Sequence, residues 1–97
     1  MLCVRSFSDE DDAVRQANES DCGLAATIVG QDQQRNARLA RRLRAGHIWI
    51  NSAPVVFPQS SWGGFKASGI GRELGPWGMA GCMGTKHVTE ARSALTV

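Results

Sequence analysis

The sequence contains no tyrosine, only two lysines, and three cysteines without a Cys-x-x-Cys pair. Three is an odd number, and Cys3, Cys22 and Cys82 are widely spaced, so neither a disulfide framework nor a zinc site is expected. Each cysteine is predicted to be a small buried side chain rather than a nucleophile, because no histidine accompanies it. This cysteine usage fits a reducing cytoplasm best.

Long apolar runs are also missing, and no basic-then-apolar leader opens the chain, so no membrane association is expected. The net charge of +2 is close to neutral and gives no bulk electrostatic reason for nucleic-acid binding. Five arginines crowd residues 35–44, but no aromatic residue interleaves them for base stacking. A solvated or subunit-facing surface is therefore favoured there over nucleic-acid contact, which would predict salt-sensitive retention of DNA or RNA.

What is present indicates one small folded unit. The chain has 97 residues, of which 42% are hydrophobic and 21% charged. That length allows at most one domain, and that composition argues against disorder while predicting a modest core.

The order of predicted elements is β-α-β-α-β. The first strand spans residues 2–7, and Ser8 is placed to cap a short acidic-start helix that ends between residues 18 and 23. The apolar run 24–29 predicts a strand covered on both faces, and a helix follows over 32–44, with Gly46 ending it in a left-handed conformation. Residues 47–51 predict a third strand. This order favours a parallel sheet with right-handed crossovers.

The segment from Pro58 to Gly75 is a long glycine-rich loop that leaves the end of the third predicted strand. Functional loops gather at the carboxyl ends of parallel strands, so we expect chemistry there. The glycines of residues 69–75 resemble a dinucleotide-binding fingerprint. However, the third glycine falls one position late and no strand leads directly into the segment, so turn geometry is the better interpretation. A helical turn over 77–80, a strand over 85–89 and a frayed end over 93–97 are predicted to follow.

Several side chains in and around this loop are candidates for function. The paired glycines after Trp62 let the backbone approach another surface closely, so the indole is either a wall of a site or a core side chain. Glu73 beside Arg72 is either part of a salt bridge, which residue type favours, or an ordered carboxylate near a cleft. His47 and His87 lack metal-ligand spacing and are predicted to be structural.

Four stretches of the sequence resemble the aldehyde dehydrogenase superfamily, in the family's order and spacing. They are ANESDCGLAA at 17–26, AGHIWIN at 45–51, PQSSWGGFKASGIGRELG at 58–75, and GTKHV at 84–88. Trp62 and the stretch GRELGPWGM at 71–79 are most similar to members that oxidise betaine aldehyde and other aminoaldehydes. The resemblance implies an α/β fold, part of a three-layer αβα catalytic domain over residues 1–82, followed by an oligomerisation strand and tail over 83–97.

The resemblance also implies functional roles, position by position. The family oxidises aldehydes to acids with NAD or NADP. Pro54, Val56 and Trp62 match positions that line the substrate tunnel, and a tryptophan at position 62 suits a cationic substrate head. Glu73 matches a carboxylate that relays a proton to the deacylating water. Residues 85–89 match a strand that joins a neighbouring subunit's sheet in homo-oligomers.

The family's nucleophilic cysteine, its general-base glutamate and its cofactor domain have no counterpart in this sequence. We therefore expect the isolated chain to be inactive and to bind no NAD or NADP by itself. The alternative is a truncated product or remnant without catalytic activity that pairs with full-length subunits.

Overall fold

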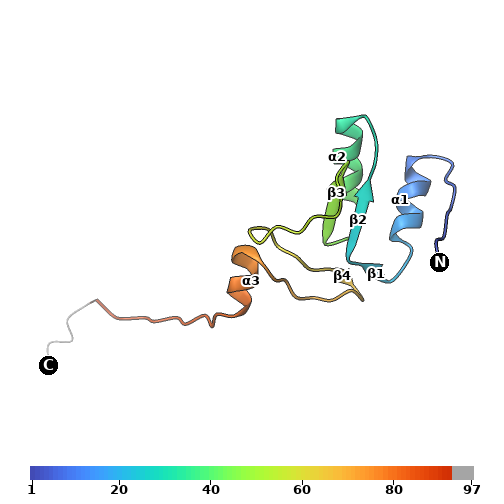
Figure 1. Ribbon diagram of the computed structural model, residues 1–97. Coiled ribbons are helices and arrows are strands. Elements are labelled where there is room, and N and C mark those ends of the chain that lie inside the picture. Colours follow the sequence, from blue (N-terminus) through green and yellow to red (C-terminus); the bar gives the residue numbers. More distant parts are fainter. Residues whose placement is uncertain (93–97) are drawn as a thin grey trace, which may run out of the picture.

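The computed structural model describes residues 1–92 and has an α/β fold with three helices and two small sheets in that range (Figure 1). Its elements are α1 (Glu10–Asn18), β1 (Cys22–Gly23), β2 (Ala25–Ile28), α2 (Gln33–Arg42), β3 (His47–Ile50), β4 (Phe65–Lys66) and α3 (Gly75–Gly81). The predicted α/β class is confirmed. The predicted frayed end at 93–97 lies outside the described residues.

Strands β2 and β3 form a parallel pair, with Ala25 opposite His47 and Ile28 opposite Ile50. Helix α2 makes the crossover between them, as the predicted β-α-β order requires. A second, antiparallel pair joins β1 to β4 and ties residues 22–23 to the glycine-rich loop. The parallel pair β2–β3, from which the loop leaves, therefore agrees with the pattern of the sequence. The β1–β4 pair is a second attachment of the loop to the rest of the chain.

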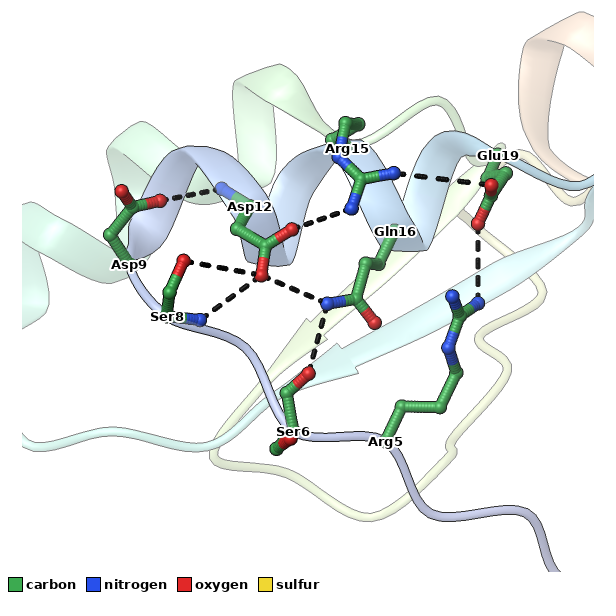
Figure 2. Close-up of polar contacts among 8 residues, drawn as sticks. All are labelled: Arg5, Ser6, Ser8, Asp9, Asp12, Arg15, Gln16 and Glu19. Atoms are coloured by element: carbon green, nitrogen blue, oxygen red, sulfur yellow. Dashed lines mark hydrogen bonds and ion pairs between the residues drawn. The ribbon is translucent and has the colours of Figure 1, made fainter.

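The predicted strand over residues 2–7 is wrong for the described chain. This segment runs alongside α1 and pairs with no strand (Figure 2). The amide of Gln16 donates to the backbone carbonyl of Ser6 at 2.9 Å, and Arg5 pairs with Glu19 at 3.2 Å. A β-prone pattern needs a neighbouring strand edge, and here polar side chains of α1 bind the segment instead.

Helix α1 is capped by Asp9 rather than by the predicted Ser8. The Asp9 carboxylate accepts the backbone N–H of Asp12 at 2.7 Å, while the N–H and the hydroxyl of Ser8 both donate to the Asp12 carboxylate (Figure 2). Chiefly because of the bond from the Ser8 backbone, with Arg15 and Gln16 adding to it, the pKa of Asp12 falls from 3.8 to about 2. The start of α1 is a reciprocal cap that requires an ionised Asp12.

This cap predicts a loss of helix stability in acid. The folded pKa of Asp12 lies below its unfolded value, so its contribution is fully present above pH 3.8 and declines as the pH falls to about 2. We expect the far-ultraviolet circular dichroism of the chain to show a loss of helix in that pH window. In Asp12→Asn this pH-dependent loss should be smaller, because position 12 no longer titrates. Asp21→Asn is the matched control, and an equal change in both variants would contradict the prediction.

Helices α1 and α2 are joined by a cluster of ion pairs. Glu10 at the start of α1 accepts from Arg35 at 3.2 Å and from Arg38 at 3.0 Å, and Asp11 pairs with Arg42 at 2.7 Å. The hydrogen bond from Arg38 is the main cause that lowers the pKa of Glu10. Three of the five arginines in 35–44 therefore face acidic partners within the chain. The absence of nucleic-acid contact through this helix stays a prediction.

The core of the described residues is small. Val14 and Ile28 are the buried hydrophobic side chains, and Asn36 is 2% exposed. Ala25 and Thr27 of β2 are exposed, so the expectation of a strand covered on both faces is wrong for this chain. Helices α1 and α2 border the same 390 Å³ groove on β2. The described residues thus show one helical layer on the sheet, and the full three-layer domain stays a prediction.

The three cysteines are exposed, which corrects the expectation that each is buried. Because the core holds so few side chains, the chain has little interior in which to place them. Helix α3 confirms the predicted helical turn. Residues 85–89 form no strand within the described chain and extend away from the body (Figure 1). A strand that pairs with another subunit needs that subunit, so this role stays a prediction.

Candidate functional site

The loop that follows β3 is held at its start by Asn51. This residue has a positive φ of 50°, and its side chain binds both backbone groups of Gly30. Its Oδ1 accepts the Gly30 N–H at 2.9 Å, and its Nδ2 donates to the Gly30 carbonyl at 2.7 Å. The buried Asn36 donates to the same carbonyl at 2.9 Å. The two chain segments that leave β2 and β3 are therefore fastened together before the loop begins.

A close backbone contact holds the loop against the start of β3. A Cβ built on Gly46 would lie 1.6 Å from the carbonyl oxygen of Gly63, so only glycine fits there. Gly46 has no positive φ, and α2 ends at Arg42, followed by Leu43 in an extended conformation. The predicted left-handed helix end is thus wrong. The predicted close approach of the paired glycines after Trp62 is confirmed.

Trp62 and Glu73 lie opposite each other across an isolated antiparallel bridge. The N–H of each donates to the carbonyl of the other at 2.8 Å. Two predicted site residues that are eleven positions apart are thereby brought together by backbone bonds alone. Their side chains remain available for other contacts, because the backbone carries the link.

The indole of Trp62 belongs to an aromatic cluster with His47 and Trp49. Ring centroids are 4.4 Å apart for His47 and Trp49, 5.4 Å for His47 and Trp62, and 5.9 Å for the two tryptophans. Trp62 is neither fully buried nor free, because it is half-covered by this cluster. This cluster is not among the features predicted from the sequence. Alternation along a strand places residues 47 and 49 on one face. This pattern predicts that His47 and Trp49 are neighbours, but it does not predict the contact with Trp62.

Pro54 and Val56, the other predicted tunnel residues, are exposed on the loop after β3. Val55 lies between them in the sequence, and its carbonyl accepts a hydrogen bond from the indole N–H of Trp49 at 2.9 Å. This hydrogen bond ties the segment that carries Pro54 and Val56 to the aromatic cluster. The structure places Pro54 and Val56 on the same segment that Trp49 holds.

The predicted salt bridge between Arg72 and Glu73 does not form. Arg72 donates to the carbonyls of Gly64 and Gly71, each at 2.8 Å, and its guanidinium lies 5.3 Å from the centre of the Phe65 ring. Adjacent residues in an extended segment point to opposite sides, which separates the two charges. Within the part of the chain that the structure describes, the exposed Glu73 forms no salt bridge.

The sequence pattern of the aldehyde dehydrogenase family matches residues 1–88. The chain belongs to this family. It is 47% identical over 90 residues to a protein of Malus domestica named aminoaldehyde dehydrogenase 2, peroxisomal, and 42% identical over 89 residues to the chloroplastic betaine aldehyde dehydrogenase of Beta vulgaris. These matches cover 93% and 92% of this aldehyde dehydrogenase chain and 18% of each relative. The chain therefore spans about a fifth of the length of these relatives.

Solved structures agree with the fold. An apo betaine aldehyde dehydrogenase of Staphylococcus aureus is 41% identical and superposes with a TM-score of 0.82, covering 84% of this chain and 16% of the solved one. A structure of the S. aureus enzyme in complex with NAD+ is 43% identical, with a TM-score of 0.75, and covers 77% of this chain and 15% of the solved one. The similarity places this aldehyde dehydrogenase chain within one portion of those enzymes.

Residues 69–75 do not have the geometry of a dinucleotide-binding turn. The glycines of 69–75 lead into α3, a helix of seven residues, and the residue before it, Leu74, makes no side-chain cap. No strand leads directly into them, as a dinucleotide fingerprint would require. Likewise, the described residues contain no cluster of potential metal ligands. Among residues 1–92 there is also no helix long and apolar enough to cross a membrane.

Proposed function

We propose that this chain forms one wall of the substrate site in an NAD- or NADP-dependent aldehyde dehydrogenase that converts an aldehyde to a carboxylic acid. The observation that carries the proposal is the bridge between Trp62 and Glu73. It holds a substrate-facing side chain and a candidate proton carrier on adjacent segments of one loop. The loop is fixed to the sheet by the contact of Gly46 with Gly63.

The proposed substrates are aldehydes with a positively charged head, such as betaine aldehyde and aminoaldehydes. The relatives with 42–47% identity are named for these substrates. The indoles of Trp49 and Trp62, tilted by 39° with centroids 5.9 Å apart, offer electron-rich ring faces. Each such face attracts an ammonium group by about 0.5–2 kcal/mol. Pro54 and Val56 add apolar surface to the same loop for the rest of the substrate.

Glu73 is proposed to relay a proton to the water that releases the acid product. A general base needs a carboxylate that is ionised and free to accept a proton. The Glu73 carboxylate is exposed, and the neighbouring Arg72 is bound to backbone carbonyls instead. The backbone bridge to Trp62 fixes the position of Glu73 without using its side chain.

Residues 85–89 are proposed to join the sheet of a neighbouring subunit in a homo-oligomer. Their extended course beyond α3 leaves backbone groups available for such pairing (Figure 1). The alternative function is a non-catalytic chain that pairs with full-length subunits through this segment. The proposed compartment is the cytoplasm, although relatives include peroxisomal and chloroplastic proteins.

The isolated 97-residue chain is predicted to have no dehydrogenase activity. The reaction consumes an aldehyde, water and NAD+ and yields an acid, NADH and a proton. The sequence has no counterpart of the family's nucleophilic cysteine, general-base glutamate or cofactor domain. We expect no NADH absorbance at 340 nm with betaine aldehyde, aminoaldehydes or acetaldehyde. Turnover that copurifies with the chain would contradict the prediction.

A complementation experiment tests the proposed role itself. The S. aureus betaine aldehyde dehydrogenase, truncated by the portion that this chain matches, is co-expressed with the chain. Recovery of NADH formation by the wild-type chain, with a loss of about tenfold or more for Trp62→Ala, supports a substrate wall, because removing an aromatic contact to a cation costs about 1–2 kcal/mol. Gly71→Ala is the matched loop control, since a Cβ there meets no atom within 4 Å. Equal recovery with Trp62→Ala would overturn the assigned role of Trp62.

A further inference from the structure

His47 is the titratable side chain of the aromatic cluster, next to Trp49 and Trp62. The centre of its ring lies 4.4 Å from that of Trp49 and 5.4 Å from that of Trp62, and the ring planes are tilted by 34° and 51°. It also lines an open cavity of 330 Å³ that is separate from the groove on β2. The other side chains on this cavity come from Ile48, Gln59, Ser60, Ser61 and Trp77. His47 is therefore the one lining residue of the cavity that can change its charge near neutral pH.

The elements around His47 supply few other charges. Its partner strand β2 carries Ala25, Ala26, Thr27 and Ile28, none of which titrates. The sequence of α3, GPWGMAG, contains no titratable residue either.

The charged groups beside Trp62 are Glu73 and Arg72. Glu73 is linked to Trp62 through backbone bonds, and Arg72 is bound to the carbonyls of Gly64 and Gly71 and lies over Phe65. Arg44 precedes β3 by three positions and is exposed. The charge on the aromatic cluster itself is thus set by the protonation of His47.

We propose that His47 is a charge-dependent specificity residue of this wall. This inference rests on the proposed function and adds the selection of the substrate head. With a neutral imidazole, the faces of Trp49 and Trp62 accept a positively charged head. Protonation places a cation against both rings, where it competes for their electron-rich faces and repels the head, while an uncharged head of the same shape is unaffected.

The experiment uses the 97-residue chain and two probes of equal shape, choline and its uncharged isostere 3,3-dimethylbutan-1-ol. Binding is followed by tryptophan fluorescence at pH 8.5 and at pH 5.0. We expect the apparent affinity for choline to fall about tenfold at pH 5.0, since two like charges a few ångströms apart at a partly exposed site repel by roughly this amount. The affinity for the isostere should not change.

Two histidine variants make the test specific. Without any probe, the tryptophan fluorescence should change between pH 5 and 8 in the wild-type chain and in His87→Gln, because His87 contacts Thr89 and not the cluster. The change should be absent in His47→Gln, and choline should then bind equally at both pH values. This control measures the effect of His47 protonation on the fluorescence of the neighbouring indoles, with no ligand present.

The outcomes separate the inference from the proposed function. Choline binding that is equally strong at both pH values in the wild-type chain overturns the role of His47 and leaves the cation-binding wall intact. Absence of choline binding at pH 8.5 overturns both the selection by His47 and the cation-binding wall. A fluorescence change that persists in His47→Gln also overturns the inference, because another group then causes it.

Discussion

Gly46→Ala should detach the glycine-rich loop from the start of β3 and destabilise the whole chain. The added Cβ would lie 1.6 Å from the Gly63 carbonyl oxygen and 2.7 Å from its carbon. Both are backbone atoms, so no side-chain rotation relieves the clash, and the loop must move away from β3. We expect a loss of about 3 kcal/mol or more in the free energy of unfolding, at the upper end of the usual cost of overpacking.

The effect is measured by urea unfolding, followed by the fluorescence of the three tryptophans. Because movement of Gly63 also moves Trp62 away from His47, the folded-state fluorescence should change as well as the midpoint. Gly84→Ala is the matched control, since the space around Gly84 is open and its φ is not positive. If Gly46→Ala and Gly84→Ala unfold at the same urea concentration, the contact with Gly63 does not hold the loop.

Gly46 also shows what the sequence could and could not predict. Its position after an arginine-rich helix indicated a helix end, which is a local property of the chain. Its actual role depends on Gly63, seventeen residues later, and no local pattern contains that contact. The glycine-rich loop as a whole was predictable, because glycines lose too much backbone freedom in helices and strands.

The helices and the parallel pair β2–β3 follow from hydrophobic period and capping signals, which act over a few residues. The segment at residues 2–7 shows the limit of such signals. Its pattern is that of a strand, but a strand requires a partner edge. Here Gln16 of α1 and Glu19, just after α1, bind the segment instead. Residues 85–89 likewise need a partner edge to form a strand, and the predicted partner is a second subunit.

In the candidate site, the strand pattern indicates that His47 and Trp49 share a face. The arrival of Trp62 on that face depends on the path of the loop and could not be derived from spacing. The resemblance to the aldehyde dehydrogenase family identified Trp62 and Glu73 as candidates. The bridge between them is a feature of this structure that the resemblance did not indicate.

Asn36 and Asn51 should show strong energetic coupling, because both donate to the carbonyl of Gly30. When one amide is removed, the other still satisfies this oxygen. Asn36→Ala removes the most buried polar side chain of the described residues and should cost about 1–3 kcal/mol. Asn51→Ala should cost about 2–3 kcal/mol, since it also places a non-glycine residue without a polar side chain at a positive φ of 50°.

The double variant should therefore lose more stability than the sum of the two single losses, by about 0.5–1 kcal/mol or more. Urea unfolding of the wild type, both single variants and the double variant gives this coupling. Asn51→Gly is the matched variant that separates the two causes at position 51, because glycine adopts the positive φ without strain but lacks the amide. It should recover about 1 kcal/mol relative to Asn51→Ala. Strictly additive losses would show that the two side chains act independently and that Gly30 is not the shared anchor of the loop.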